Sequence, residues 1–178
     1  MPNPRRMPAL ALLLGGGVLL VAVSGHGDTP APRAAGAQEV TVLGVVLSPQ
    51  TGVPTVVLQG RRDGRTLAMS IGPAEATGIA FPLAKRTPPR PLTHDLFLTL
   101  FGRLDVTVTR VVITDLRDDI YYAVLHLAAR GESFAVDTRP SDAIALAIRA
   151  GAPVLVEDKV FEKSERPPSS PPPSGPRI

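Results

Sequence analysis

The chain has 178 residues and no cysteine, so disulfides, thiolate chemistry and cysteine-based metal sites are all excluded. It carries 19 Lys and Arg residues against 16 Asp and Glu residues. The excess lies outside residues 38–163, where 14 basic and 14 acidic residues cancel. This part of the chain therefore has no net attraction for a phosphate backbone, and any anion binding must be local.

The first 24 residues have the pattern of an export signal. Arg5 and Arg6 precede an uncharged run over residues 7–24, and Ala22-Val23-Ser24 offers small residues at the spacing of a cleavage site. The run is as long as a short membrane span, so an uncleaved anchor is the alternative. We expect a periplasmic or extracellular protein. It would contact the inner membrane only if the segment over residues 7–24 is not cleaved.

Two further segments lack the pattern of packed structure. Residues 25–37 are small, polar and proline-bearing, as in a linker. Residues 164–178 hold six prolines in fifteen positions, which predicts a disordered tail. The sequence thus predicts a single folded domain over residues 38–163.

The domain begins with patterns typical of β-strands. Two runs rich in β-branched residues, 40–47 and 53–58, flank the turn sequence at 48–52 and predict a hairpin. A second turn at 61–64 leads into a third strand over 66–71.

Two helices are predicted next. The first has Pro73 at its first position and Glu75 in its first turn, and it should end near Leu83. The proline-rich loop at 85–91 excludes both helix and central strand. Thr93 is expected to cap the second helix, whose apolar face comprises Leu96, Phe97, Leu100 and Phe101.

The remaining residues predict a strand meander, a buried helix and a last strand. The strands cover 105–114, 120–128 and 133–137, with strict alternation in the first of them. An almost wholly apolar helix follows at 141–149, and a short strand at 153–156 ends the pattern. We therefore predict a single-domain α+β fold, with an antiparallel or mixed sheet and about three helices packed on it.

Two motifs share an Arg-Pro pair, a hydroxyl residue and an aspartate at the start of a predicted helix. They are Arg90-Pro-Leu-Thr-His-Asp95 and Arg139-Pro-Ser-Asp142. A helix N-terminus carries unpaired N–H groups and partial positive charge, and the arginine adds a bidentate donor, so phosphate is the favoured ligand. The predicted substrate-binding residues are Arg90, Thr93, Arg139 and Ser141.

The aspartates oppose phosphate binding unless a divalent cation lies between the negative charges. Mg²⁺ or Mn²⁺ binds carboxylate oxygens, bridges to phosphate and activates water. Asp137 and Asp142 are the predicted metal ligands. His94 is the predicted general base or acid. The predicted catalytic residues are Glu75, His94, Asp95 and Asp142.

A structural interpretation accounts for many of the same residues. Thr93 and Ser141 are good helix caps, and acidic side chains favour helix starts through the dipole alone. Tyr121 and Tyr122 place one ring on each face of a strand, which indicates packing more than base stacking.

Five segments, in order along residues 39–162, resemble the bifunctional nuclease family, also known as a domain of unknown function. They are VLGVVLSPQTGVPTVVLQG at 42–60, SIGPAEATGIA at 70–80, PPRPLTHDLF at 88–97, VVITDLRD at 111–118 and DTRPSDAIALAIRAGAPVLV at 137–156. The resemblance implies an α+β fold, a homo-oligomer (most simply a dimer) and hydrolysis of DNA and RNA phosphodiester bonds. The residues matching shared motifs are Glu75, Arg90, Thr93, His94, Asp95, Asp137, Arg139, Ser141 and Asp142.

The resulting prediction is an exported, metal-assisted nuclease with nucleic acid as its substrate. Two alternatives remain open. One is a non-catalytic module in which the helix starts form a ligand pocket or an oligomer interface. The other is an enzyme acting on a smaller phosphoester. The sequence does not show whether the two Arg-Pro motifs lie close together in the folded protein. Their proximity is therefore a prediction.

Overall fold

The computed structural model of the protein describes residues 36–165. The predicted export segment, most of the predicted linker and the predicted tail from residue 166 onward lie outside the described residues. Within the described range, no helix is both long enough and apolar enough to cross a membrane.

Seven strands form one sheet in the order β3-β2-β1-β7-β4-β5-β6. In chain order they are β1 (Ala37–Leu47), β2 (Pro54–Gly60), β3 (Thr66–Ser70), β4 (Val106–Arg117), β5 (Ile120–Ala129), β6 (Glu132–Thr138) and β7 (Val154–Glu157). The short strand β7 joins two antiparallel three-stranded meanders, antiparallel to β1 and parallel to β4. The sheet is therefore mixed, as predicted.

Strand β4 departs from the strict alternation predicted for it. Its register against β5 shifts between Val108 and Arg110, and again between Ile113 and Asp115. A β-bulge places two residues opposite one and reverses which side chains point into the core beyond it. The turn from β4 to β5 is made by Asp118 and Asp119, which both take the left-handed conformation that a tight two-residue turn requires.

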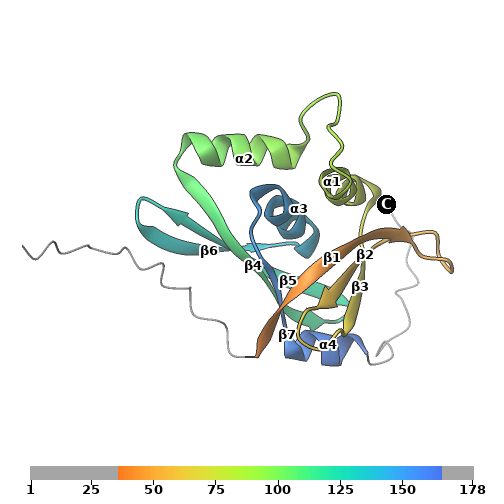
Figure 1. Ribbon diagram of the computed structural model, residues 1–178. Coiled ribbons are helices and arrows are strands. Elements are labelled where there is room, and N and C mark those ends of the chain that lie inside the picture. The colour runs from red at the N-terminus through yellow and green to blue at the C-terminus, as the bar shows by residue number, and fades with distance from the viewer. Residues whose placement is uncertain (1–35, 166–178) are drawn as a thin grey trace, which may run out of the picture. The chain divides into compact units, whose positions relative to one another are not determined.

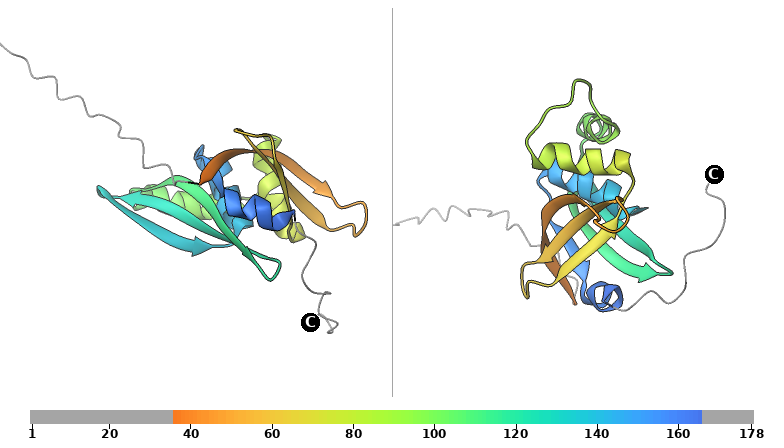
Figure 2. Two further views of the ribbon diagram at one scale, coloured as in Figure 1. Left: turned by 90° about the horizontal axis from the view of Figure 1, so that it is seen from below. Right: turned by 90° about the vertical axis from the view of Figure 1, so that its right-hand side faces the viewer.

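Four helices pack on this sheet. They are α1 (Pro73–Leu83), α2 (Thr93–Arg103), α3 (Pro140–Ala150) and α4 (Asp158–Ser164). Figure 1 draws α1, α2 and α3 together above the strands and α4 below them. The second view in Figure 2 shows the same grouping. The α+β prediction is confirmed. Helices α1, α2 and α3 all begin on the same side of the sheet (Figure 1).

Helix α3 is central to the core, as its apolar sequence predicted. It contacts α1, α2, β4 and β5, and residues 143–147 are all buried. Alanine at three of these five positions allows close approach of the neighbouring elements. Gly151 ends the helix in the left-handed conformation, which a residue without Cβ adopts at little cost.

The predicted hydroxyl caps are wrong at both Arg-Pro helix starts. Leu92, not Thr93, is the N-cap of α2, and its backbone N–H donates to the Asp95 carboxylate at 2.8 Å. Arg139 is the N-cap of α3, and Ser141 lies inside the first turn with 7% of its surface exposed. The proline explains the shift in α3, because Pro140 is suited to the first helical position and forces the preceding residue into extended conformation.

Helix α4 was not predicted. Its seven residues are too few to form a stable helix alone. Val160 and Phe161 are fully buried, and the guanidinium of Arg65 lies 4.6 Å from the Phe161 ring centroid. Arg65 also pairs with Asp158 at 2.9 Å. Tertiary contacts with the β2–β3 region therefore stabilise this helix, and it ends at the first residue of the predicted tail.

Candidate functional site

The starts of α1, α2 and α3 meet around one surface depression of about 360 Å³. The two Arg-Pro motifs, far apart in the chain, both reach it. The residues that matter for its chemistry are Glu75 and Gly78 from α1, Thr93 and His94 from α2, and the N-cap Arg139 with Asp142 from α3. The predicted proximity of the two motifs is thus confirmed.

Asp142 is the centre of the polar contacts in this depression. Its Oδ1 lies 3.3 Å from His94 Nε2. Arg139 donates from Nε to Oδ2 at 2.6 Å and from Nη2 to Oδ1 at 3.1 Å, which is the bidentate geometry typical of arginine and carboxylate. Arg139 Nη1 also pairs with Glu75 Oε1 at 2.9 Å. One chain of contacts therefore runs from His94 through Asp142 and Arg139 to Glu75.

The members of this chain differ in their exposure to solvent. The His94 side chain is 13% exposed, those of Glu75 and Asp142 are 20% and 30% exposed, and that of Arg139 is 65% exposed. The imidazole and carboxylates are thus partly desolvated, which strengthens their mutual electrostatic interactions. The arginine projects into solvent, where an incoming anion would meet it first.

Asp142 is held in its ionised form. Burial raises the pKa of its carboxyl group, but hydrogen bonds from Arg139 and His94 outweigh burial and leave the pKa below its usual value. The hydrogen bond with Asp142, followed by the pairing with Glu75, raises the pKa of Arg139. The ionised carboxylate beside the imidazole fixes the orientation of the ring.

Gly78 determines how closely the His94 ring approaches α1. A Cβ atom at residue 78 would lie 2.8 Å from Cε1 of His94 and 3.0 Å from its Nδ1, closer than side chains tolerate. The ring therefore occupies space that only glycine leaves open. Because Nε2 contacts Asp142, Nδ1 is the nitrogen left to accept a proton when Nε2 carries one.

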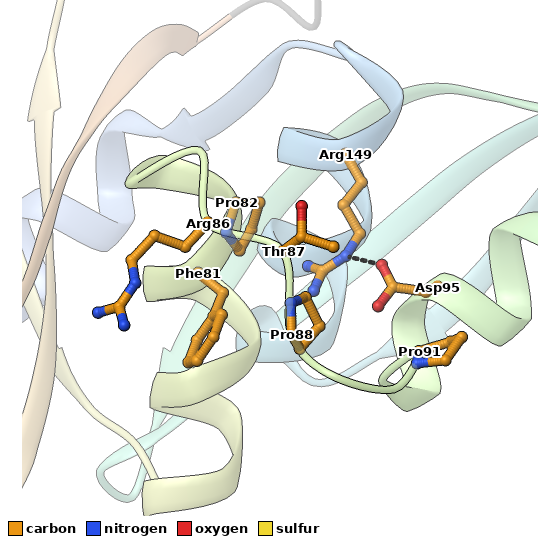
Figure 3. Close-up of a pocket in the computed structure, with 8 residues that line it drawn as sticks. All are labelled: Phe81, Pro82, Arg86, Thr87, Pro88, Pro91, Asp95 and Arg149. Carbon is orange, nitrogen blue, oxygen red and sulfur yellow. Dashed lines mark hydrogen bonds and ion pairs between the residues drawn. The ribbon is translucent and has the colours of Figure 1, made fainter.

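Arg149 connects the end of α3 to the start of α2. Its Nε donates to Asp95 Oδ1 at 2.7 Å, and its Nη1 donates to the carbonyl oxygens of Gly78 and Ala145 at 2.6 and 2.9 Å. Its side chain is only 8% exposed. Figure 3 shows the guanidinium of Arg149 facing the carboxylate of Asp95, with Pro88 and Pro91 of the proline-rich loop drawn close to the pair. This pair anchors the helix start that presents His94.

Asp95 thus lies outside the His94 cluster, although it is adjacent to His94 in the chain. One carboxylate oxygen accepts from Arg149 and the other from the Leu92 backbone. Burial raises the pKa of Asp95, but these hydrogen bonds outweigh it and lower the pKa below the usual value. Both oxygens are engaged, so its geometry is that of a structural anchor.

The other residues singled out in the sequence lie at the rim or elsewhere. Thr93 is exposed and lines the depression, and Ser141 lines an adjoining one. Arg90 is exposed on the loop before α2, and Asp137 is exposed on β6, where it pairs with Val124 of β5. Neither Arg90 nor Asp137 is among the residues that line the depression.

The side chains present do not form a ready metal site. Both Asp142 oxygens already accept from Arg139, and one also contacts His94. Among residues 36–165, no three His, Asp or Glu side chains are grouped so that they could hold a metal ion. The pairing of Asp137 with Asp142 around a cation therefore stays a prediction, and the chemistry below is derived from the protein side chains alone.

Two residues important for this geometry were missed in the sequence. Gly78 lies inside a predicted helix, where glycine lowers helix stability by about 1 kcal/mol relative to alanine. A glycine at such a position indicates that a neighbouring group approaches the helix closely. Arg149 is a charged residue in the last turn of an apolar helix. Its partner Asp95 is 54 residues away in the chain, so no local pattern identifies the pair.

An α+β domain with a His–Asp–Arg–Glu chain at converging helix starts has the components of an acid–base site with an adjacent anion-binding group. The profile of the bifunctional nuclease domain matches residues 56–169, more than half of the chain. The chain therefore belongs to the bifunctional nuclease domain family. All four cluster residues, Glu75, His94, Arg139 and Asp142, fall within the matched range.

Similar proteins occur in bacteria and plants. A Mycobacterium tuberculosis (strain H37Rv) protein described as uncharacterized is 36% identical over 126 residues, which cover 71% of this chain and 75% of that protein. Bifunctional nuclease 1 of Oryza sativa subsp. japonica is 33% identical over 103 residues. That match covers 55% of this chain but only 31% of the rice protein. Most of the rice protein thus has no counterpart in the alignment.

Proposed function

We propose that this protein is a nuclease that hydrolyses phosphodiester bonds in DNA and RNA. The observation that supports it most is the contact between His94 and Asp142, which unites the two Arg-Pro motifs in one depression beside the exposed Arg139. Membership of the bifunctional nuclease domain family supplies the substrate class. The neutral charge of residues 38–163 is compatible with this proposal, because the phosphate contact is local to Arg139.

His94 is the proposed general base. In this proposal Nε2 carries the proton directed at Asp142, and the unprotonated Nδ1 takes a proton from water. The water oxygen attacks phosphorus, the bond from phosphorus to the leaving oxygen breaks, and the leaving oxygen takes a proton from solvent. Asp142 stabilises the imidazolium formed on His94 without itself being protonated.

Arg139 is the proposed phosphate ligand. A guanidinium has five N–H donors, and three of those on Arg139 are used by Asp142 and Glu75. The two that remain can donate to a phosphate oxygen and stabilise the charge that develops during attack. The carboxylates of Asp142 and Glu75 hold the guanidinium plane in place for that contact.

A non-catalytic role is the alternative, and one observation favours it. His94, Asp142, Arg139 and Glu75 are linked in one chain of contacts, so the cluster would also hold three helix starts together. In that case substitutions in the cluster would lower the melting temperature or alter oligomerisation with no activity to lose. An activity measurement beside a melting curve separates the two roles.

The direct test is a cleavage assay of the purified protein on end-labelled single-stranded and double-stranded DNA and on RNA. It should be run with Mg²⁺, Mn²⁺, Ca²⁺ and with chelator, because metal assistance was predicted from the sequence. We expect both DNA and RNA to be cut. A folded protein that is inert toward every substrate under all of these conditions would refute the proposal.

We also infer that the protein forms a homodimer through α2. Three large apolar side chains on this helix and the one on its C-cap are 48–58% exposed: Leu96, Phe97, Leu100 and the C-cap Leu104. No charged residue lies between Asp95 and Arg103. Contiguous exposed apolar surface of this kind marks interaction sites.

A second copy fits this surface for two reasons. An uncharged apolar face is complementary to itself across a two-fold axis. In addition, two antiparallel copies of α2 place opposite helix dipoles side by side, which favours their pairing.

The dimer inference predicts that Leu100→Asp converts the protein to a monomer, because it would bury unpaired carboxylates at the interface. Light scattering coupled to size-exclusion chromatography measures the mass directly. Leu47→Asp is the matched control, since Leu47 is 68% exposed at the far end of β1 and should leave the mass unchanged. A monomeric wild-type protein, or equal dissociation of both variants, would rule out this interface.

A further inference from the structure

A second depression, of about 410 Å³, adjoins the one that contains His94. Glu75 and Arg139 line both, so the ion pair between them forms the boundary. The second depression lies between the β3–α1 junction and the start of β5, whereas His94 and Asp142 line only the first. Its volume is within the range of about 300–1,000 Å³ found for small-molecule sites.

The walls of the second depression are largely apolar and include one aromatic ring. Ile71, Ile120 and Pro140 contribute aliphatic surface, and Tyr121 contributes the ring. The neighbouring tyrosine is on the opposite face of β5, where the Arg117 guanidinium lies 4.0 Å from the ring centroid of Tyr122. Only Tyr121 of this pair therefore faces the depression.

The polar groups of this depression suit a neutral ligand and not a phosphate. Two carboxylates, Glu75 and Asp119, line it, and both would repel an anion. Positive charge comes from Arg139 at the boundary with the first depression. Ser70 and Ser141 add hydroxyl groups, each of which both donates and accepts hydrogen bonds.

We propose that this second depression binds a nucleobase of the nucleotide adjoining the scissile phosphate, with Tyr121 as the wall on which the base packs. The proposal rests on the proposed nuclease function and adds a base subsite to it. A phosphate held by Arg139 at the boundary would have His94 on one side and the base-binding depression on the other. The linkage between phosphate and base in a nucleotide spans such a boundary.

The lining also indicates how selective this subsite is. Hydroxyl groups satisfy either a donor or an acceptor on a base edge, and an aromatic ring packs against any base. Burial, and secondarily the charge of Asp119, raise the pKa of Tyr121, so the phenol stays neutral near neutral pH. The subsite should therefore require a base without distinguishing strongly among bases, as expected for an enzyme that cuts both DNA and RNA.

The test compares binding of a nucleoside monophosphate with binding of ribose phosphate, which lacks the base, to the full chain. Wild type should bind the nucleotide about 5- to 150-fold more tightly, the range expected for stacking of one base. Tyr121→Ala should lose this preference while its affinity for ribose phosphate stays unchanged. Tyr121→Phe should retain the preference, because it keeps the ring.

Tyr122→Ala is the matched control, and it should keep the preference because Tyr122 faces away from the depression. Equal binding of both ligands to wild type would overturn the proposal. So would a Tyr121→Ala protein that weakens both ligands to the same extent, since a purely structural role predicts that result. Cleavage of nucleic acid by the same preparations reports separately on the nuclease function, so base-dependent binding to an inert protein would refute that function alone.

Discussion

His94→Ala should lower the kcat for phosphodiester cleavage by about 10²- to 10⁴-fold, the usual contribution of a positioned general base. The side chain is 13% exposed, and among residues 36–165 its one polar partner is Asp142 at 3.3 Å. Its removal leaves Arg139 paired with both carboxylates, so phosphate binding and therefore KM should change little. Steady-state kinetics on a labelled oligonucleotide measures both parameters.

Asp142→Asn should also reduce kcat, because the amide neither stabilises an imidazolium nor holds the guanidinium with full charge. Unlike the His94 variant, it should raise KM as well, since Asp142 positions Arg139 through two hydrogen bonds. A protein that carries both His94→Ala and Asp142→Asn should have a kcat only slightly below that of the less active single variant, because the two side chains act as a unit.

Thr93→Ala is the control for these two variants. Thr93 lines the same depression but is exposed and does not cap its helix. Its loss should change kcat less than threefold, an amount on the order of 0.6 kcal/mol. If His94→Ala retained wild-type kcat with an unchanged melting curve, the general base would have to be another residue.

Arg149→Met should lower the free energy of unfolding by about 1–3 kcal/mol, the cost of leaving partly buried hydrogen-bonding groups without their partner. The substitution leaves Asp95 without its cationic partner and removes the donor from the carbonyl oxygens of Gly78 and Ala145. Urea denaturation followed by circular dichroism measures the change. Activity should fall in parallel, because Arg149 anchors the start of α2, which presents His94.

Arg103→Met is the matched control for Arg149→Met. Arg103 is an exposed arginine in the last turn of α2, so its loss should change stability by no more than about 0.5 kcal/mol. Adding Asp95→Asn to Arg149→Met should recover part of the lost stability, because the uncompensated carboxylate is then removed. An Arg149→Met protein as stable as the Arg103 variant would show that the pair does not anchor α2.

Local patterns were sufficient for most of the secondary structure. Pro73 at the first position of α1, Gly151 after α3 and Asp118-Asp119 between β4 and β5 are each signals that act within a few residues of the backbone. The apolar sequence of α3 indicated its burial in the same way. These features depend on steric limits of single residues or on side-chain periodicity, which a sequence displays directly.

Features that depend on long-range packing were missed or misplaced. Helix α4 owes its stability to burial of Val160 and Phe161 and to contacts of Arg65, which is distant in the chain. The caps expected at Thr93 and Ser141 were wrong because Leu92, after the proline-rich loop, is the N-cap of α2, and because Pro140 takes the first position of α3. Propensity gives only a weak preference when packing energies are larger.

For the site, the sequence by itself singled out the residue types: the two Arg-Pro motifs, His94 and the acidic residues beside them. Only the tertiary structure decided which of them meet. It placed Glu75, His94, Arg139 and Asp142 around one depression, turned Asp95 toward Arg149, and left Arg90 and Asp137 outside. The reason is that contacts spanning 48 or 54 residues are set by how three helices pack on the sheet, and no local pattern encodes that arrangement.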